Sequence, residues 1–389
     1  MVAITRPARL PVPEPAAQAH SLALVAHIRA AIEAAGGFLP FHRYMEAALY
    51  APGLGYYSAG AHKLGEGGDF TTAPELSPLF SRCLARQAQE VLAALGGGSV
   101  LEFGAGTGAM AEAVLDELAR LDALPERYLI LEVSPDLRQR QQARLARFGV
   151  RVAWIDAPPP AFRGVVLANE VLDAMPVHRL ELTESGVFEQ GVTWRDGRFA
   201  WDRRPLTHPT LAARAERIAR LTEGVTPYRT EVNLAAEGWV ADLGRWLERG
   251  AALLIDYGFP EHEFYHPQRH EGTLMCHYRH HAHDDPFVYP GLQDLTAHVD
   301  FSAIARAARG AGLEVAGYTA QAFFLLGLGL EEMLREAQGD ERAYLALAQQ
   351  VKRLTLPSEM GELFKVMALA RGLDLPLSGF ALNDRRPTL

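Results

Sequence analysis

The sequence predicts an α/β fold in which helices cover both faces of a mostly parallel β-sheet. Two observations carry this prediction: short apolar segments of strand length alternate with amphipathic helical segments, and a glycine-rich turn joins the first such strand to the first helix. This alternation is typical of βαβ units, whose crossovers keep the strands parallel. The expected core strands are 99–103, 128–132, 151–155, 165–168, 252–256, 313–318 and 363–370, and the expected core helices are 109–121, 136–148 and 301–310.

With 389 residues, the chain can carry additions to one such core. We expect the core over 99–176 and 251–372, with an insertion over 177–250. The insertion should begin as a β-meander, because apolar and polar residues alternate around two turn signals, and should continue as helices at 211–221 and 235–247. Outside the core we expect a disordered leader (1–20), a helical segment from 21 to 98 that contains a long aromatic loop, and a C-terminal tail (373–389).

Composition and charge limit the partners. The net charge of −9 provides no basic surface for nucleic acid, and no apolar run reaches the ~20 residues that a membrane span needs. The N-terminal stretch is broken by prolines and lacks the apolar core of a secretory signal. Two widely separated cysteines, Cys83 and Cys276, fit a reducing compartment. We therefore expect a bacterial cytoplasmic protein; a mitochondrial matrix location would require the leader to be a transit peptide.

The glycine-rich turn is a candidate ligand site. It reads Glu102-Phe103-Gly104-Ala105-Gly106-Thr107-Gly108 and opens the first core helix. Glycines there let a ligand approach the backbone, and the helix N-terminus offers free N–H groups. Because Ala109 completes a GxGxx(G/A) pattern, a dinucleotide-binding oxidoreductase stays open at this point.

Acidic residues lie near the ends of three successive strands. Glu102 precedes the first glycine by two residues, Glu132 ends the second strand and Asp156 follows the third. They could receive, in that order, the amino group of a methionine moiety, the ribose hydroxyls and an adenine amino group. Since carboxylates repel a pyrophosphate, the three acids favour a cationic sulfonium ligand, S-adenosyl-L-methionine, over a dinucleotide. Each acid could instead be a solvated strand end or a helix cap.

Three polar residues follow the fourth strand: Asn169, Glu170 and Asp173. Ligands of open α/β sheets bind outside the carboxyl ends of the strands, so we expect these side chains to face a substrate. Carboxylates beside an amide oxygen favour a nitrogen nucleophile, and a carboxylate can hold a guanidinium through two hydrogen bonds. Glu170 is the first candidate for this role and Asp173 the second, although either could cap the following helix.

Several sequence blocks, taken in order, resemble one known family. They are LYAPGLGYYSAG (49–60), KLGEGGDFTTAPELSP (63–78), LEFGAGTG (101–108), LEVSP (131–135), ANEVLDAMPVH (168–178), LIDYG (254–258), DLTAHVDF (294–301) and MGELFK (360–365). Over roughly residues 37–372 the chain resembles the MidA-type class I S-adenosyl-L-methionine-dependent methyltransferases. The resemblance implies a Rossmann-like class I sheet with its last strand antiparallel, and a methyltransferase that uses this cofactor.

The resemblance also implies roles for individual residues. Those implied to bind or cover the cofactor are Gly104, Gly106, Gly108, Glu132, Asp69, Phe70 and Thr71, the last three in a covering loop. Asn169 and Glu170 would face the substrate, which in a mitochondrial relative is an arginine of a respiratory-chain subunit.

One position departs from the pattern of arginine methyltransferases. Those enzymes carry a second glutamate about nine residues after the first, where this chain has Arg179. A second acid would have to come from elsewhere, such as Asp69, Glu75 or Asp300.

Seven of the 14 histidines lie between His262 and His283, which raises the question of a metal site. Their spacing matches no compact ligand pattern and Asp284 and Asp285 make the stretch polar, so we expect no metal. His298 could lie near the substrate or be a hydrogen-bonded structural residue.

The leading prediction is a methyltransferase that uses S-adenosyl-L-methionine to methylate an arginine of a partner protein such as a respiratory-chain subunit. The alternatives are a cofactor-binding assembly chaperone and a small-molecule N-methyltransferase. A homodimer is compatible with the sequence.

Overall fold

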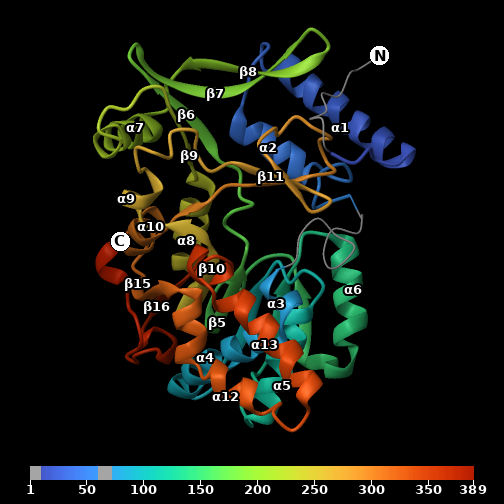
Figure 1. Cartoon of the computed structure of the whole chain (residues 1–389), viewed down its shortest axis with the longest axis vertical. Helices are drawn as coiled ribbons and strands as arrows, with labels where there is room; N and C mark the ends of the chain where they lie inside the picture. Colours follow the sequence, from blue (N-terminus) through green and yellow to red (C-terminus); the bar gives the residue numbers. More distant parts are fainter. Residues whose placement is uncertain (1–9, 60–71) are drawn as a thin grey trace. The chain divides into compact units, whose positions relative to one another are not determined.

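The computed structural model describes residues 10–59 and 72–389, and the chain divides into two compact units. Unit 1 comprises Met1–Phe70, Asp173–Ala236 and Phe259–Asp300, and unit 2 comprises Thr71–Leu172, Glu237–Gly258 and Phe301–Leu389. Figure 1 labels many of the helices and strands in both units. Among the described residues, every helix is too short or too polar to span a lipid bilayer.

Unit 2 is built on a mixed sheet with strand order β15-β16-β10-β5-β2-β3-β4. Neighbouring strands from β10 to β4 are parallel, whereas β16 runs antiparallel to both β10 and β15. The predicted α/β class is thereby confirmed. The strands are β2 (Ser99–Phe103), β3 (Tyr128–Leu131), β4 (Val152–Ile155), β5 (Phe162–Asn169), β10 (Leu247–Phe259), β15 (Glu314–Ala320) and β16 (Phe364–Arg371).

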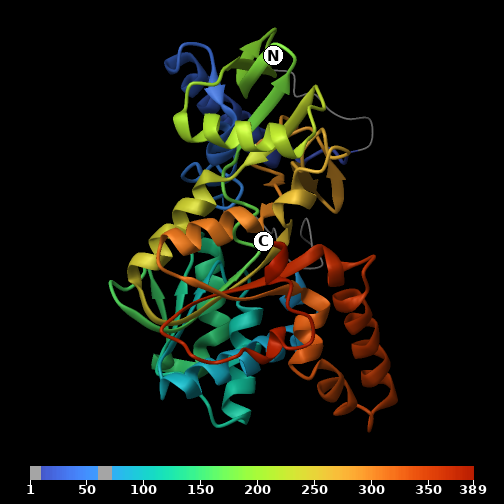
Figure 2. The same ribbon diagram turned by 90° about the vertical axis from the view of Figure 1, so that its left-hand side faces the viewer.

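Helices cover both faces of this sheet, which explains why its strands are apolar throughout. On one face, alternate strand residues such as Val100, Ile130 and Leu253 join a core with α4, α5 and the C-terminal helices. On the other face Phe103 packs edge-on against Trp239 of α8, with ring centroids 5.0 Å apart. Figure 2 shows α8 and α5 on opposite sides of the sheet. The helices concerned are α3 (Ala73–Leu76), α4 (Pro78–Leu95), α5 (Ala109–Arg120), α6 (Pro135–Leu145), α8 (Leu234–Trp246), α10 (Phe301–Gly310), α11 (Gln321–Gly327), α12 (Leu330–Arg335), α13 (Glu341–Thr355) and α14 (Met360–Leu363).

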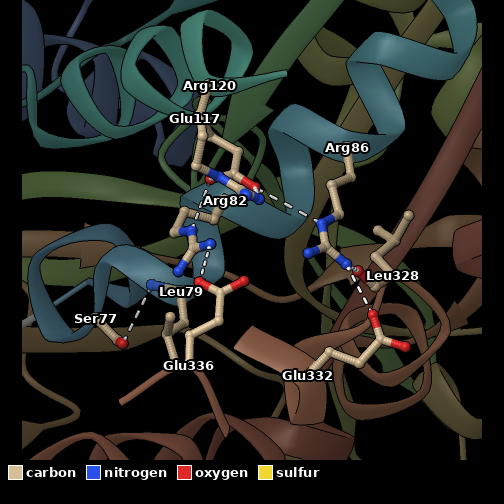
Figure 3. A network of polar contacts seen from close by, with 9 residues as sticks. All are labelled: Ser77, Leu79, Arg82, Arg86, Glu117, Arg120, Leu328, Glu332 and Glu336. Carbon is tan, nitrogen blue, oxygen red and sulfur yellow. Dashed lines mark hydrogen bonds and ion pairs between the residues drawn. The ribbon is translucent and has the colours of Figure 1, made fainter. Parts of the chain in front are cut away.

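A network of ion pairs around one buried carboxylate joins α4, α5 and α12. Glu117 of α5 is only 3% exposed and accepts hydrogen bonds from Arg82 Nε of α4 at 2.8 Å and from Arg120 Nη2 at 2.6 Å. Arg82 also donates to Glu336, just after α12, and Arg86 donates to Glu332 within it (Figure 3). Each buried charge in the network has a partner of opposite sign, because burying an unpaired charge would cost free energy.

Unit 1 contains a separate antiparallel sheet of order β1-β7-β6-β9, with β8 paired to β7. A second, three-stranded sheet has the order β12-β11-β13. The strands of these two sheets are β1 (Leu39–Pro40), β6 (His178–Thr183), β7 (Gly186–Arg195), β8 (Arg198–Pro205), β9 (Tyr228–Val232), β11 (Met275–Tyr278), β12 (His281–His283) and β13 (Asp294–Thr296), whereas β14 (Val299–Asp300) belongs to neither sheet. The helices are α1 (Pro15–Ala34), α2 (Phe41–Tyr50), α7 (Pro209–Leu221) and α9 (Glu261–Phe264).

Some boundaries differ from the prediction. Helix α1 begins at Pro15, so the part of the expected leader from 15 to 20 is helical; proline at the first helical position has no N–H to satisfy. The insertion contains a strand, β9, between its helices. Residues 259–300, expected in the core, belong to unit 1, and 72–98, expected in the N-terminal segment, belong to unit 2. The C-terminal stretch also packs, since Phe380 is buried against Phe324.

Candidate active site

The glycine-rich turn lies at the carboxyl end of β2. Gly104, Gly106 and Gly108 all have positive φ, at 63°, 53° and 84°, a conformation that costs other residues energy. Gly108 also caps the N-terminus of α5. The backbone N–H groups of the first turn of α5 therefore face the edge of the sheet where the parallel strands end, and they can receive a polar ligand.

Glu102 lies just before this turn, and its side chain is buried. Tyr128 of β3 donates a hydrogen bond of 2.5 Å to Glu102 Oε2, whereas Oε1 has no hydrogen-bond partner among the described residues. Burial raises the pKa of Glu102 to about 8, against the lowering effect of the Tyr128 hydrogen bond. A buried carboxylate oxygen that lacks a hydrogen-bond donor among the described residues suits a cationic donor from a ligand.

Gln141 of α6 ties three elements of the site together. Its Nε2 donates to the carbonyl oxygen of Gly106 at 2.8 Å and to Glu132 Oε2 at 2.9 Å, and its Oε1 accepts from the indole N–H of Trp154 at 2.9 Å. Glu132 also accepts from the backbone N–H of Ser134. Burial raises the pKa of Glu132, while these hydrogen bonds lower it. The carboxylate of Glu132 is therefore held beside the glycine turn.

Asp156 is placed differently from the other two acids. Its side chain is 87% exposed and pairs with Arg138 Nη1 of α6 at 2.7 Å. The structure therefore does not bring it into the buried group formed by Glu102, Glu132 and Gln141.

Asn169 and Glu170 form a pair at the end of β5. Asn169 Nδ2 donates to Glu170 Oε1 at 2.9 Å, and the hydroxyl of Tyr257 donates to Glu170 Oε2 at 3.3 Å. Glu170 has φ of 53°, in the left-handed region that glutamate rarely adopts. Strain of this kind persists where the surroundings enforce it and is concentrated at functional sites.

Asp256 of β10 holds this turn in place. Its Oδ2 accepts the backbone N–H of Leu172 at 2.9 Å, and the backbone N–H of Glu170 donates to the carbonyl oxygen of Ile255 at 2.9 Å. Asp256 is 1% exposed, so the contact is shielded from water. Sequence reasoning assigned no role to Gln141, Asp256 or Tyr257, although the last two lie in the block LIDYG (254–258) that carries part of the family resemblance.

The remaining predicted residues are distributed over both units. Glu75 of α3 accepts a hydrogen bond from the hydroxyl of Thr107 in the glycine turn. Asp173, Asp300 and His298 belong to unit 1, where the carbonyl of Asp173 accepts from Ala297 and the ring of His298 contacts Phe259. Asp69, Phe70 and Thr71 lie outside the described residues.

A family model of S-adenosyl-L-methionine-dependent methyltransferases matches residues 83–319, which is more than half of the chain. The chain belongs to this family. Its cofactor is S-adenosyl-L-methionine, and the predicted family and cofactor are confirmed. A crystal structure of a Burkholderia thailandensis protein bound to S-adenosyl-homocysteine is 50% identical, covers 98% of this chain and 100% of that one, and superimposes with a TM-score of 0.93.

Curated relatives of this methyltransferase include mitochondrial proteins named protein arginine methyltransferase NDUFAF7. The Danio rerio protein is 28% identical over 397 residues, covering 89% of this chain and 86% of its own. The Drosophila melanogaster homologue is 29% identical over 388 residues, covering 90% and 85%.

The residues at the end of the sheet fit this cofactor. Glu102 Oε1, which has no hydrogen-bond partner in the part of the chain that the structure describes, suits an amino group. The positive-φ glycines leave space beside the backbone, and Glu132 offers a carboxylate of the kind that binds a ribose diol. When bound, the cofactor supplies a methyl group on a sulfonium.

Proposed function

We propose that this methyltransferase methylates a terminal guanidinium nitrogen of an arginine in a partner protein. The observation that carries the proposal is the Asn169 and Glu170 pair, in which two donors orient a carboxylate on a strained turn at the end of β5. The names of the curated relatives support the same substrate class.

The cofactor would be held by the three glycines of the turn, by Glu102 through its buried oxygen and by Glu132. Gln141 would position Glu132 and the Gly106 carbonyl relative to each other. Asp156 is left out of this set, because its exposed carboxylate already pairs with Arg138.

Glu170 would orient the substrate arginine. Arginine remains protonated at neutral pH, so the protein has to direct one nitrogen toward the methyl group rather than remove a proton beforehand. A glutamate carboxylate offers about four lone-pair sites, so Glu170 can accept hydrogen bonds from a guanidinium as well as from Asn169 and Tyr257. Methylation releases one proton, which Glu170 could pass to solvent.

Glu75 is the best placed second acid in unit 2. The Thr107 hydroxyl links it to the glycine turn, so it lies on the same side of the sheet as the bound methyl donor would. Asp173, the second candidate from the sequence, belongs to unit 1.

The test uses the full chain with isotopically methyl-labelled cofactor and protein extract from cells that lack this protein. Labelled methylarginine in a protein, identified by mass spectrometry and lost in Glu170→Gln, would support the proposal; Glu184→Gln, in an exposed hairpin turn, is the matched control. Respiratory-chain subunits are the first acceptors to examine.

Other outcomes separate the alternatives. If the label appears only in small amines, the protein is a small-molecule N-methyltransferase and its substrate is not a protein. Cofactor binding without any transfer, while partner assembly still depends on the protein, would favour a chaperone.

A further inference from the structure

Two histidines and a glutamate of unit 1 gather in one cluster that the methyltransferase site does not use. They are His42 in the first turn of α2, His178 at the start of β6 and Glu189 within β7. One potential ligand atom from each lies within 4.8 Å of those of the other two. The ring centroids of His42 and His178 are 3.9 Å apart.

The hairpin register explains how two of these residues meet. Leu180 of β6 pairs with Glu189 of β7, and His178 precedes Leu180 by two residues. Residues two apart in a strand share a face, so His178 and Glu189 are diagonal neighbours on one face of the hairpin. His42 completes the cluster from α2, close to Glu189.

The distances suit a metal ion. His178 Nδ1 lies 2.8 Å from Glu189 Oε1, and His42 Nδ1 lies 3.9 Å from the same oxygen. Two ligand atoms that bind tetrahedral zinc at ordinary bond lengths are about 3.3 Å apart, so small side-chain rotations would bring both pairs to that spacing.

A purely structural cluster would leave one group unsatisfied. His42 Nδ1 is buried and has no hydrogen-bond partner among the described residues, although its ring is packed against His178. A buried nitrogen without a partner costs free energy, which a metal bond would offset.

We propose that His42, His178 and Glu189 bind one divalent transition-metal ion of the zinc class. Two histidines and one carboxylate leave a fourth position open, which water or His208 could fill, since the ring centroids of His178 and His208 are 6.1 Å apart. The ion would fasten α2 to the β6 and β7 hairpin. None of the seven histidines between His262 and His283 takes part.

Calorimetric titration of the untagged full chain with ZnCl₂, after removal of metal by a chelator, tests this proposal. We expect one ion per chain, an affinity at least tenfold lower in His42→Ala and in Glu189→Gln, and unchanged binding in His281→Ala, the matched control from the histidine-rich stretch. Co²⁺ in place of Zn²⁺ should give a visible absorption band that is absent in the first two variants.

Two results would overturn the proposal: no stoichiometric binding to the wild-type chain, or binding that His42→Ala and Glu189→Gln leave unchanged. Thermal melting of the metal-free variants shows whether each of them is folded. Glu189→Gln should fold like the wild type, because glutamine has nearly the same shape as glutamate. Zn²⁺ should raise the melting temperature of the wild type and of His281→Ala but not that of Glu189→Gln.

Discussion

The hydroxyl of Tyr128 donates a 2.5 Å hydrogen bond to one oxygen of Glu102, and the other oxygen has no hydrogen-bond partner among the described residues. The described residues thus satisfy only one of the two oxygens of this buried carboxylate. Such an arrangement costs folding energy in the free enzyme and becomes favourable when a cationic ligand group arrives.

Replacing Glu102 with glutamine should therefore stabilise the free protein while weakening cofactor binding. The folded-state pKa of Glu102 is raised from 4.5 to about 8, so the wild type loses stability as the pH rises between these values, and the variant does not. At pH 8 we expect a higher melting temperature for Glu102→Gln and at least tenfold weaker binding of S-adenosyl-homocysteine by calorimetry. Glu314→Gln, on the exposed surface of β15, should change neither. Unchanged affinity in Glu102→Gln would remove Glu102 from the cofactor site.

Cofactor affinity should also depend on pH. A cationic amino group binds the ionised form of Glu102, which is the minor form below a pKa of about 8. The affinity for S-adenosyl-homocysteine should rise from pH 6 to pH 8, by at most tenfold per pH unit. Calorimetry in buffers of different ionisation enthalpy should detect a proton released on binding, and Glu102→Gln should abolish that release. A flat profile in the wild type would contradict this assignment.

Gln141→Leu should weaken cofactor binding without creating a cavity in the core. The change keeps the side-chain volume but leaves the Gly106 carbonyl, Glu132 and the Trp154 indole without their shared partner. We expect about tenfold weaker cofactor binding, which corresponds to roughly 1.4 kcal/mol. Its neighbour Gln142 is exposed, so Gln142→Leu provides the control. Equal affinities of the two variants would show that the network has no part in binding.

Tyr257→Phe should lower the rate of methyl transfer and spare cofactor binding. The lost hydroxyl donates to Glu170, so the carboxylate would be less well oriented toward a substrate. We expect kcat to fall about tenfold with little change in cofactor Kd. Tyr344→Phe, on α13, controls for the loss of a hydroxyl elsewhere. A change in cofactor affinity alone would place Tyr257 on the cofactor side.

Glu117→Ala should destabilise unit 2 by about 3 kcal/mol, because it leaves Arg82 without its buried partner. Burial raises the pKa of Glu117, but the hydrogen bonds from Arg120 and Arg82 outweigh it and the net pKa is lowered. The stabilisation is therefore present above about pH 4.5 and is lost as the pH falls through the lower folded-state pKa. Urea unfolding at pH 7 and pH 3.5 should show the difference between wild type and variant shrinking at the lower pH. Glu331→Ala removes an exposed pair with Arg335 and should cost under about 1 kcal/mol.

The sheet of unit 2 was predictable because its strands are continuous apolar runs, a pattern that burial on both faces requires. The strand 99–103 and the helix 301–310 match β2 and α10 at both ends. Strand β9 was not among the expected strands, although Tyr228, Thr230 and Val232 alternate with Arg229 and Glu231 as in a half-buried strand. The run has only five residues, and its partner β6 lies about fifty residues earlier in the chain.

At the site, local signals pointed to Glu102 and the glycines, which lie at the end of β2 and in the turn that follows it; their part in cofactor binding stays a prediction. Position at a strand end did not determine where a side chain points, and Asp156 pairs with Arg138 in solvent. The contacts of Gln141 and Asp256 with distant residues leave no local pattern. The same holds for His42, which meets His178 and Glu189 only through the fold.

The hydrogen bond between Trp154 and Gln141 gives the protein an intrinsic optical reporter. Trp154 is one of five tryptophans, and its indole N–H is joined through Gln141 to both the glycine turn and Glu132. Indole emission responds to hydrogen bonding and local polarity, so loading of the site can be followed by fluorescence without a label. Subtracting the response of Trp154→Phe isolates this signal from the other four tryptophans.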